Sequence, residues 1–307
     1  MKIAIAGSGA LGSGFGYMLK KGGHDVTLMD FWEEHIQTVQ EEGLTIDFNG
    51  QTENVGITMD KPENIEGKFD VIFIFTKSMG LRGMLEAIDH TISEDTKVIC
   101  LLNGLGHADT LSEYVPAENI IMGTTVWTAG LDAPGTVHLM GEGPVEVQEV
   151  APEGKEATLE MVKVMKDSGL NGVYSSDVHF TTWRKACVNG TMNALSALLD
   201  TNIEELFESE QTKAVVKEII AEFALAAKLD GVELDVDDIM TYVVNLSEKV
   251  GPHYPSMHQD IANRRPTEID FLNGIVAEMC EANGYSAPNC RLITQLIHAK
   301  EEILGIA

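Results

Sequence analysis

A glycine-rich turn near the start of the chain is the feature that most constrains its fold. Residues 2–6 (KIAIA) form a short apolar run, and residues 9–22 carry apolar side chains at helical spacing. Where these segments meet, residues 7–12 read GSGALG, a G-x-G-x-x-G pattern between a predicted strand and a predicted helix. In that position the pattern is typical of the first turn of a dinucleotide-binding βαβ unit. An ordinary glycine-rich turn is the alternative.

Each glycine of this turn has a physical reason in a dinucleotide site. Gly7 permits the sharp turn, Gly9 lets the backbone approach a pyrophosphate at the positive helix N-terminus, and Gly12 lets helix and strand pack closely. Asp30 ends the second apolar run, where we expect its carboxylate to accept hydrogen bonds from the adenosine ribose; capping of the next helix is the alternative. The residues expected to bind this part of the dinucleotide are Gly7, Ser8, Gly9, Ala10, Leu11, Gly12 and Asp30.

Further apolar runs predict a parallel sheet. They are short, rich in Val, Ile and Phe, and separated by segments long enough for helices, which is typical of strands buried on both faces. These runs are residues 25–30, 69–76, 97–102 and 119–126. Residues 135–140 and 144–149 instead alternate in polarity around Gly141-Glu142-Gly143, so we expect an antiparallel hairpin added at the sheet edge.

The second half of the chain is predicted to be helical. Helical patterns separated by polar or glycine-containing breaks cover residues 158–168, 179–199, 203–208, 212–230, 236–250, 268–283 and 289–304. The polar stretch Ser175-Ser176-Asp177 follows the last expected strand, Val173-Tyr174, and precedes the long helix predicted over residues 179–199. We therefore expect an α/β fold, with a Rossmann-like dinucleotide-binding domain over residues 1–175 and an all-helical substrate and catalytic domain over residues 176–307.

Charge and composition exclude several classes of protein. The chain has 48 Asp and Glu against 21 Lys and Arg, a formal charge of −27 that repels nucleic acid and anionic membranes. No run approaches the ~18 apolar residues of a membrane span, and glycines interrupt the apolar start before a signal-peptide core forms. The cysteines at 100, 187, 280 and 290 have neither metal-ligand nor disulfide spacing. We expect a cytoplasmic protein with reduced thiols and no metal, nucleic-acid or membrane partner.

A polar stripe marks the first long helix of the second half. Within residues 182–195, Lys185, Asn189 and Asn193 recur every four residues, which at about 100° per residue places them on a face about 80° wide. The other faces of this helix are apolar, and a polar stripe on an apolar helix requires partners or a ligand. A solvent-facing stripe on a partly buried helix is the alternative.

A second polar cluster surrounds Pro266. Its members are Ser256, Asp260, Arg264, Thr267, Glu268 and Asp270. The residues after Pro266 also form a good helix start with acids in the first turn, so helix capping alone would explain them. His253 and His258 lie five residues apart without a third ligand nearby, which predicts neither a zinc site nor a catalytic triad.

Together these features resemble the ketopantoate reductase (2-dehydropantoate 2-reductase) family over nearly the whole chain. The matching elements are GSGALG at 7–12, Thr76-Lys77 and Asn103-Gly104 after the third and fourth core strands, the helix with Trp183, Lys185, Asn189 and Asn193, and PSMHQD…TEID…NG at 255–274. The resemblance implies an N-terminal dinucleotide-binding domain, a C-terminal helical domain and an active site between them.

The resemblance also implies roles for residues of the helical half. Lys185 corresponds to the family's catalytic lysine, and Glu268 corresponds to the glutamate that supports the active site and contacts the ligands. Asn189, Asn193 and Ser256 correspond to substrate-binding positions. These are the side chains that the polar stripe and the Pro266 cluster select from their pattern alone.

Two residues of the first half match positions on the nicotinamide side of the family's site. They are Lys77 and Asn103, and both follow strands at their carboxyl ends, where open α/β sheets bind ligands. The chain departs from the family at Leu102, where a glutamine is usual, at Gly80, where a glutamine is frequent, and around His253-Tyr254, where an asparagine is frequent. These departures bear on which substrate is preferred.

The expected cofactor is NAD(P)(H), with NAD(H) favoured. Familiar members of the family prefer NADPH and carry a basic side chain after the second strand, whereas this chain has Asp30-Phe31-Trp32 and no Lys or Arg directly after it. The D-mandelate-type 2-hydroxy acid dehydrogenases are similar relatives within the superfamily and look NAD-dependent. They imply a competing substrate class.

The reaction expected from the resemblance is reversible hydride transfer between the nicotinamide and a bulky or branched 2-oxo acid. Ketopantoate to (R)-pantoate is the first choice, and a D-mandelate-type 2-hydroxy acid dehydrogenase is the alternative. Negative charge grows on the carbonyl oxygen as hydride arrives, so Lys185 is the expected general acid. A non-catalytic dinucleotide sensor is the alternative of another class, although the presence of both Lys185 and Glu268 disfavours it. The partner is a small molecule, and a homodimer is left open.

Overall fold

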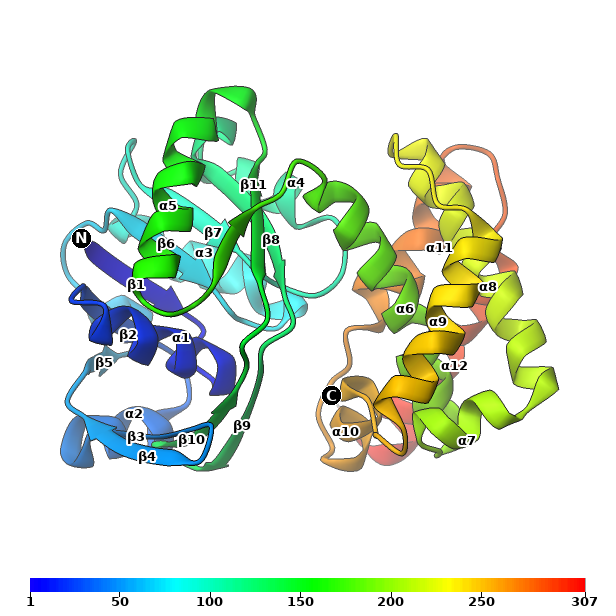
Figure 1. Ribbon diagram of the computed structural model, residues 1–307, viewed down its shortest axis with the longest axis horizontal. Helices are drawn as coiled ribbons and strands as arrows, with labels where there is room; N and C mark the ends of the chain where they lie inside the picture. The colour runs from blue at the N-terminus through cyan, green and yellow to red at the C-terminus, as the bar shows by residue number, and fades with distance from the viewer. Residues whose placement is uncertain (307) are drawn as a thin grey trace. The chain divides into compact units, whose positions relative to one another are not determined.

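The computed structural model describes residues 1–306, and these form two compact units. One unit contains residues 1–102 and 107–178, and the other contains residues 103–106 together with the chain from His179 onward. The first unit combines a sheet with helices, whereas the second is helical (Figure 1). The loop 103–106 therefore folds with the helical unit, although it follows a strand of the first.

An eight-stranded sheet within residues 1–306 forms the centre of the first unit. Its order is β12-β11-β8-β7-β6-β1-β2-β5. The strands β1 (Lys2–Ala6), β2 (Asp25–Met29), β5 (Thr58–Asp60), β6 (Val71–Ile74), β7 (Lys97–Cys100) and β8 (Ile120–Thr125) pair in parallel. At the other edge, β11 (Val145–Glu149) pairs antiparallel to β8, and β12 (Gly172–Tyr174) pairs parallel to β11. This confirms the predicted Rossmann-like α/β fold with an antiparallel addition.

The central strands are apolar along their length because both faces of the sheet are covered. On β1, Ile3 and Ile5 share a core with Phe15 of α1 (Ala10–Lys21), whereas Ala4 and Ala6 belong to a second core with α3 (Leu81–Ile88). All of these strand side chains are fully buried. The first unit also contains α2 (Glu33–Glu42), α4 (His107–Ser112) and α5 (Lys155–Asp167).

The first unit has a second sheet that the sequence patterns above do not predict. Within the described residues it has the order β4-β3-β10-β9, with β3 (Leu44–Phe48), β4 (Gln51–Val55), β9 (Thr128–Ala133) and β10 (Thr136–Met140). The predicted hairpin of 135–140 with 144–149 is wrong, because β10 pairs with β9 and β3 while β11 pairs with β8. Residues 141–143 cross between the sheets: a Cβ on Gly141 would lie 2.5 Å from the Trp127 ring, and Trp127 Nε1 donates to the Gly143 carbonyl at 2.7 Å.

The second unit is built from seven α-helices within the described residues. They are α6 (Val178–Leu199), α7 (Ile203–Glu208), α8 (Glu210–Leu229), α9 (Val236–Val250), α10 (Ser256–Ala262), α11 (Asn273–Ala282) and α12 (Pro288–Leu304). Trp183 of α6, Phe223 of α8 and Ile297 of α12 belong to one continuous core. A Cβ on Gly190 would lie 2.4 Å from the Phe223 ring, so this glycine lets α6 and α8 approach closely.

Two elements of this unit differ from the sequence prediction. The short helix α10 is not predicted, and the single helix predicted over residues 268–283 is wrong. Residues Ile269–Phe271 form a 3-10 turn, and Leu272, at φ −118° and ψ −96°, separates it from α11. The loop 103–106 accounts for this break, because Leu105 N donates to the Phe271 carbonyl at 3.0 Å and takes the place of a helical partner.

The four cysteines act as packing residues. All of them are buried and free, and burial raises the pKa of the Cys100 thiol to about 12.

Among residues 1–306, no helix is long and apolar enough to cross a membrane.

Candidate active site

The phosphate turn, residues 7–12, joins β1 to α1 in the first unit. Gly7 N and Ser8 N donate to the Met29 carbonyl at 2.9 and 3.1 Å, which holds the turn to the end of β2. The buried Ser8 hydroxyl accepts from Met29 N at 3.0 Å and donates to the Ile5 carbonyl at 3.1 Å. The first N–H groups of a helix have no partners within it, so the start of α1 can receive an anion.

The three glycines of the phosphate turn have different surroundings. A Cβ on Gly7, which has φ +92°, would lie 2.4 Å from Thr76 N, and a Cβ on Gly12 would lie 2.2 Å from the Gly7 carbonyl oxygen. A Cβ on Gly9 would meet nothing within 4 Å. The turn is therefore tightly packed against the protein but open at Gly9, as the close approach of a pyrophosphate requires.

Asp30 follows β2 and is half-buried. Its Oδ1 accepts hydrogen bonds from Phe31 N at 2.8 Å and Trp32 N at 3.0 Å, just before α2 begins. The carboxylate therefore stabilises the turn into α2, which is close to the alternative that the sequence leaves open. Lys61, which follows the neighbouring strand β5, is paired with Glu33 in the first turn of α2.

Thr76 and Lys77 follow β6, next to the phosphate turn. Both side chains are half-buried, and the Thr76 backbone packs against Gly7. The Thr76 hydroxyl oxygen is buried without a hydrogen-bond partner among the described residues. A buried hydroxyl without a partner is costly, and its place at the carboxyl end of a parallel strand fits a polar ligand.

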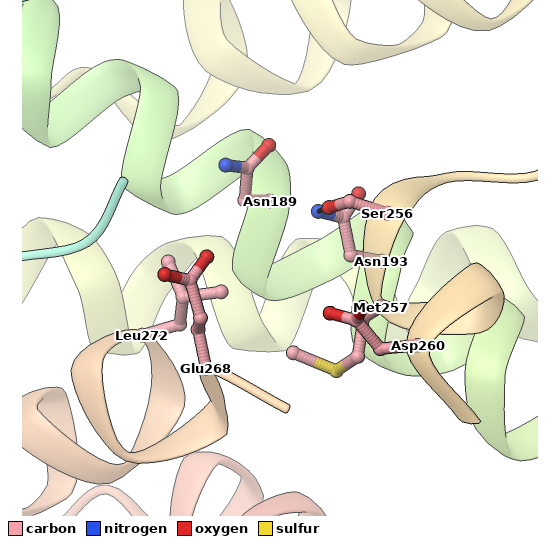
Figure 2. Close-up of a pocket in the computed structure, with 7 residues that line it drawn as sticks. All are labelled: Asn189, Asn193, Ser256, Met257, Asp260, Glu268 and Leu272. Atoms are coloured by element: carbon pink, nitrogen blue, oxygen red, sulfur yellow. Dashed lines mark hydrogen bonds between the residues drawn. The ribbon is translucent and has the colours of Figure 1, made fainter. Parts of the chain in front are cut away.

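A small pocket lies within the second unit (Figure 2). Its lining residues are Asn189, Asn193, Ser256, Met257, Asp260, Glu268 and Leu272. Asn189 and Asn193 come from successive turns of α6, and Asn193 Nδ2 donates to Ser256 Oγ at 3.2 Å. This hydrogen bond connects α6 to the start of α10. The fold thus gathers, around one cavity, polar side chains from segments far apart in the sequence.

Lys185 lies one helical turn before Asn189 on α6 and is half-buried. Burial lowers the pKa of its ammonium group to about 8, and the Glu268 carboxylate opposes that shift. Such an ammonium is mostly protonated near neutral pH, yet it releases its proton more readily than an exposed lysine does. The Lys185 ammonium thus lies within electrostatic range of the Glu268 carboxylate, which lines the pocket.

Asn103 is brought to the same group by the loop 103–106. Its Nδ2 lies 3.5 Å from Glu268 Oε2, at the limit of a hydrogen bond. Gly104 has φ +91°, and a Cβ there would lie 2.7 Å from the Phe271 carbonyl oxygen, so the loop packs closely beside the 3-10 turn. Asn103 therefore folds with the residues around Glu268, whereas Lys77 belongs to the first unit.

Two groups near Pro266, the Asp260 carboxylate and the Thr267 backbone, have structural partners. Asp260 Oδ1 accepts from Arg265 Nε at 3.0 Å, and Thr267 N donates to Glu301 Oε1 at 2.8 Å. These contacts fix the chain on both sides of Pro266 and so help to position Glu268. His258 is paired with Asp200 at 2.9 Å, and no group of three metal-ligating side chains occurs within residues 1–306.

Three residues that line the pocket have no assigned role in the sequence analysis. Met257 and Leu272 supply an apolar wall and are each 2% exposed. In the sequence, Asp260 is only one member of a polar cluster. Its spacing does not show whether its side chain lines a pocket or forms an ion pair. Each of the three follows Ser256 or Glu268 by a few positions, and this closeness in the sequence is the only signal that could have indicated it.

Comparison with known proteins agrees with this arrangement. A family model described as "Ketopantoate reductase PanE/ApbA" matches residues 3–152, and "Ketopantoate reductase PanE/ApbA C terminal" matches residues 177–301. The 2-dehydropantoate 2-reductase of Streptococcus pyogenes serotype M3 is 48% identical over 307 residues, which cover 100% of both chains.

Two solved structures are similar over the full length of both chains. One is a D-mandelate dehydrogenase with NADH and anilino(oxo)acetate, at 43% identity and a TM-score of 0.95 with 100% of each chain covered. The other is a putative 2-dehydropantoate 2-reductase from Enterococcus faecalis, at 46% identity and a TM-score of 0.83 with the same coverage. Since the two family models together match most of the chain and a relative with 48% identity covers all of it, the chain belongs to the ketopantoate reductase family of oxidoreductases.

Proposed function

We propose that this enzyme transfers a hydride between a nicotinamide dinucleotide and the carbonyl carbon of a bulky or branched 2-oxo acid. Ketopantoate, reduced to (R)-pantoate, is the first choice of substrate. The observation that carries the proposal is the placement of Lys185 beside Glu268, one helical turn from the pocket residue Asn189. Relatives named 2-dehydropantoate 2-reductase support the choice of substrate.

Lys185 supplies the proton in this mechanism. Negative charge develops on the carbonyl oxygen during reduction, and an ammonium aimed at that oxygen stabilises the transition state more than the ground state. With a pKa lowered to about 8, Lys185 can donate its proton near neutral pH and accept it in the reverse direction. Glu268 keeps the charged form of Lys185 stable enough to act as the donor.

Asn189, Asn193 and Ser256 hold the substrate. Their amide and hydroxyl groups line the pocket and can donate hydrogen bonds to a carboxylate or accept them from a side-chain hydroxyl. Asn193 and Ser256 already contact each other, so their orientation is fixed before substrate arrives. Such preorganisation lowers the entropy cost of orienting the carbonyl group for reaction.

The first unit fits a nicotinamide dinucleotide, which supplies or accepts the hydride when bound. Residues 7–12 present helix N–H groups on a side that is open at Gly9, and they would hold the pyrophosphate. Asp30 would bind the adenosine ribose, while Lys77 and Asn103 would line the nicotinamide. We favour NAD(H), because a 2′-phosphate would meet the Asp30 carboxylate while Lys61 is paired with Glu33.

A D-mandelate-type 2-hydroxy acid dehydrogenase is the second candidate function. It is favoured by the TM-score of 0.95 to a D-mandelate dehydrogenase whose structure contains NADH and anilino(oxo)acetate. The apolar wall of Met257 and Leu272 suits an aromatic arm as well as a branched aliphatic one. The two candidates share the same proton donor and differ in the substrate arm.

A substrate panel tests both candidates. Purified enzyme is mixed with NADH or NADPH and, in turn, ketopantoate, phenylglyoxylate and small unbranched 2-oxo acids, and loss of the reduced nicotinamide absorbance is followed. We expect the highest kcat/KM with ketopantoate; a higher value with phenylglyoxylate would establish the second candidate. Silence across the whole panel with both cofactors would favour the dinucleotide sensor, which family membership and the presence of Lys185 and Glu268 disfavour.

The homodimer that the sequence leaves open stays a prediction. Sedimentation velocity of the purified protein over a range of concentrations tests it. A single species with the mass of one chain at every concentration would exclude the dimer.

A further inference from the structure

His35 of α2 is a fully buried histidine beside the phosphate turn. Its Nε2 lies 3.0 Å from the Ser8 carbonyl oxygen and 3.3 Å from Ser13 Oγ. Its Nδ1 accepts a hydrogen bond from Gly135 N, at the turn between β9 and β10, at 2.8 Å. One imidazole ring therefore connects the phosphate turn to the second sheet, and none of the roles proposed above uses it.

The partners of His35 determine its tautomer. A backbone N–H can only donate, so Nδ1 must carry a lone pair and the ring proton must be on Nε2, which donates to the Ser8 carbonyl. Burial lowers the pKa of His35, which keeps the ring neutral. Ser13 Oγ also donates to the Ser8 carbonyl, at 2.7 Å. This carbonyl therefore receives two donors from the interior of the unit.

The Ser8 carbonyl shares a peptide plane with Gly9 N–H. In a trans peptide the C=O and the N–H point in opposite directions, and the described chain has no cis peptide bond. Fixing the carbonyl toward His35 and Ser13 therefore turns Gly9 N–H toward the opposite side. At Gly9 the surroundings are open, since an added Cβ would meet nothing within 4 Å.

We propose that His35 is a positioning residue of the dinucleotide site, which orients the Ser8–Gly9 peptide so that Gly9 N–H faces the pyrophosphate. The inference rests on the proposed function, because it takes the phosphate turn as the dinucleotide site. The Trp32 ring stacks on the imidazole, with ring centroids 5.3 Å apart and an interplanar angle of 20°, and restrains it further. The ring thus acts on the cofactor through the backbone and does not need to touch it.

Two substitutions separate the hydrogen bonds of His35. The amide nitrogen of a glutamine can occupy the position of Nε2, so His35→Gln keeps the donor to the Ser8 carbonyl. The shorter asparagine reaches only the position of Nδ1, so His35→Asn keeps the contact to Gly135 and loses the donor. We expect the NADH Kd, measured by fluorescence titration, to stay within about threefold in His35→Gln and to rise about tenfold or more in His35→Asn. The kcat at saturating NADH should change by less than about threefold in both variants, because Lys185 is untouched.

A matched control separates positioning from general loss of stability. Val39 lies on the same helix, is 2% exposed and packs in the core, so Val39→Ala destabilises α2 without removing a hydrogen bond to the phosphate turn. We expect a lower unfolding temperature and an unchanged NADH Kd for Val39→Ala. If His35→Asn does not fold, Ser13→Ala removes the other donor to the Ser8 carbonyl and should also raise the Kd by several-fold.

The outcomes distinguish this inference from the proposed function. Equal NADH affinity of His35→Gln and His35→Asn, or equal weakening by Val39→Ala, would overturn the positioning role. Unchanged affinity in Ser13→Ala, where that variant is needed, would do the same. Unchanged affinity in Gly9→Val would instead overturn the phosphate turn as the dinucleotide site, and with it the proposed function.

Discussion

Lys185 experiences two opposing influences on its charge. Burial disfavours the ammonium form and Glu268 favours it, and the resulting pKa of about 8 lies close to physiological pH, as the proposed proton transfer requires. The same lysine in an exposed position would hold its proton too tightly to exchange it readily. The environment of this residue, more than its identity, therefore makes it a suitable acid and base.

Removing the Lys185 amine should lower turnover without weakening cofactor binding. We expect Lys185→Ala to lower kcat about 10²–10⁴-fold, the usual effect of losing a positioned acid, while the Kd for NADH stays near its parent value. Lys185 belongs to the second unit, whereas the phosphate turn belongs to the first. Steady-state rates and a cofactor titration check both parts. A loss of less than about threefold in kcat at saturating substrate would remove Lys185 from the catalytic role.

The direction of the reaction should determine the sign of its pH dependence. In the proposed mechanism reduction uses protonated Lys185, so its rate should fall as pH rises through about 8. Oxidation uses the neutral amine, so its rate should rise over the same range. The profiles of kcat/KM in both directions check this expectation. Two profiles with the same sign would show that another group titrates in the rate-limiting step.

Asp30 should select the cofactor, although it also stabilises a turn. Asp30→Asn keeps an Oδ1 acceptor for Phe31 N and Trp32 N and removes the charge, whereas Asp30→Ala removes both. We expect the parent to prefer NADH by about 10–150-fold in kcat/KM, the size expected for repulsion between the Asp30 carboxylate and a 2′-phosphate after screening by solvent. Both variants should lose much of that preference. A parent that prefers NADPH, or variants whose cofactor ratio does not move, would show that this carboxylate is not the selector.

Among the elements, the βα unit around the phosphate turn is the one in which substitutions should most clearly separate NADH binding from folding. Gly9→Val places its side chain in open space and should fold, yet it should weaken NADH binding by filling the room that the pyrophosphate needs. Gly12→Val, as a control, would bring its Cβ within 2.2 Å of the Gly7 carbonyl oxygen and should lower the unfolding temperature. Cofactor affinity that is unchanged in a folded Gly9→Val protein would contradict the proposed phosphate site.

The elements differ in how far the sequence could predict them. Strands such as β1 and β6 are buried on both faces and read as continuous apolar runs, so the parallel sheet is predictable. The β3–β4 hairpin could also have been found, because Asn49-Gly50, both at positive φ, is a favoured two-residue hairpin turn. Strand β9 could not, since it is largely exposed and lacks an apolar pattern.

Tertiary contacts decide the parts of the site that the sequence leaves open. The spacing of Lys185, Asn189 and Asn193 already places them on one face of a helix, and this stripe faces the pocket or Glu268. The break at Leu272 depends on a hydrogen bond from Leu105, which is far away in the sequence, so no local pattern reveals it. The apolar wall of Met257 and Leu272 is equally indistinguishable from ordinary core until the fold is known.

At the scale of the whole molecule, burying the Lys185 ammonium for its proposed role should lower the free energy of unfolding. Between about pH 8 and the ordinary lysine pKa of 10.5, the unfolded chain binds more protons at Lys185 than the folded chain does. Folding stability from this group therefore rises with pH across that window, and the cost is fully present below pH 8.

Replacing Lys185 with an uncharged chain of similar length should reveal this cost. We expect Lys185→Met, free of ligands, to be more stable than the parent by about 1–3 kcal/mol near neutral pH, since one pKa unit corresponds to about 1.4 kcal/mol. The gain should shrink as pH rises through the window from 8 to 10.5, where the parent lysine becomes neutral in both states. Urea unfolding of both proteins at several pH values measures this gain. Lys300→Met serves as a control for the loss of another lysine of the second unit, whose amine donates to the Ala197 carbonyl. A Lys185→Met protein that is less stable than the parent at neutral pH would show that the favourable contacts of the ammonium outweigh the cost of its desolvation.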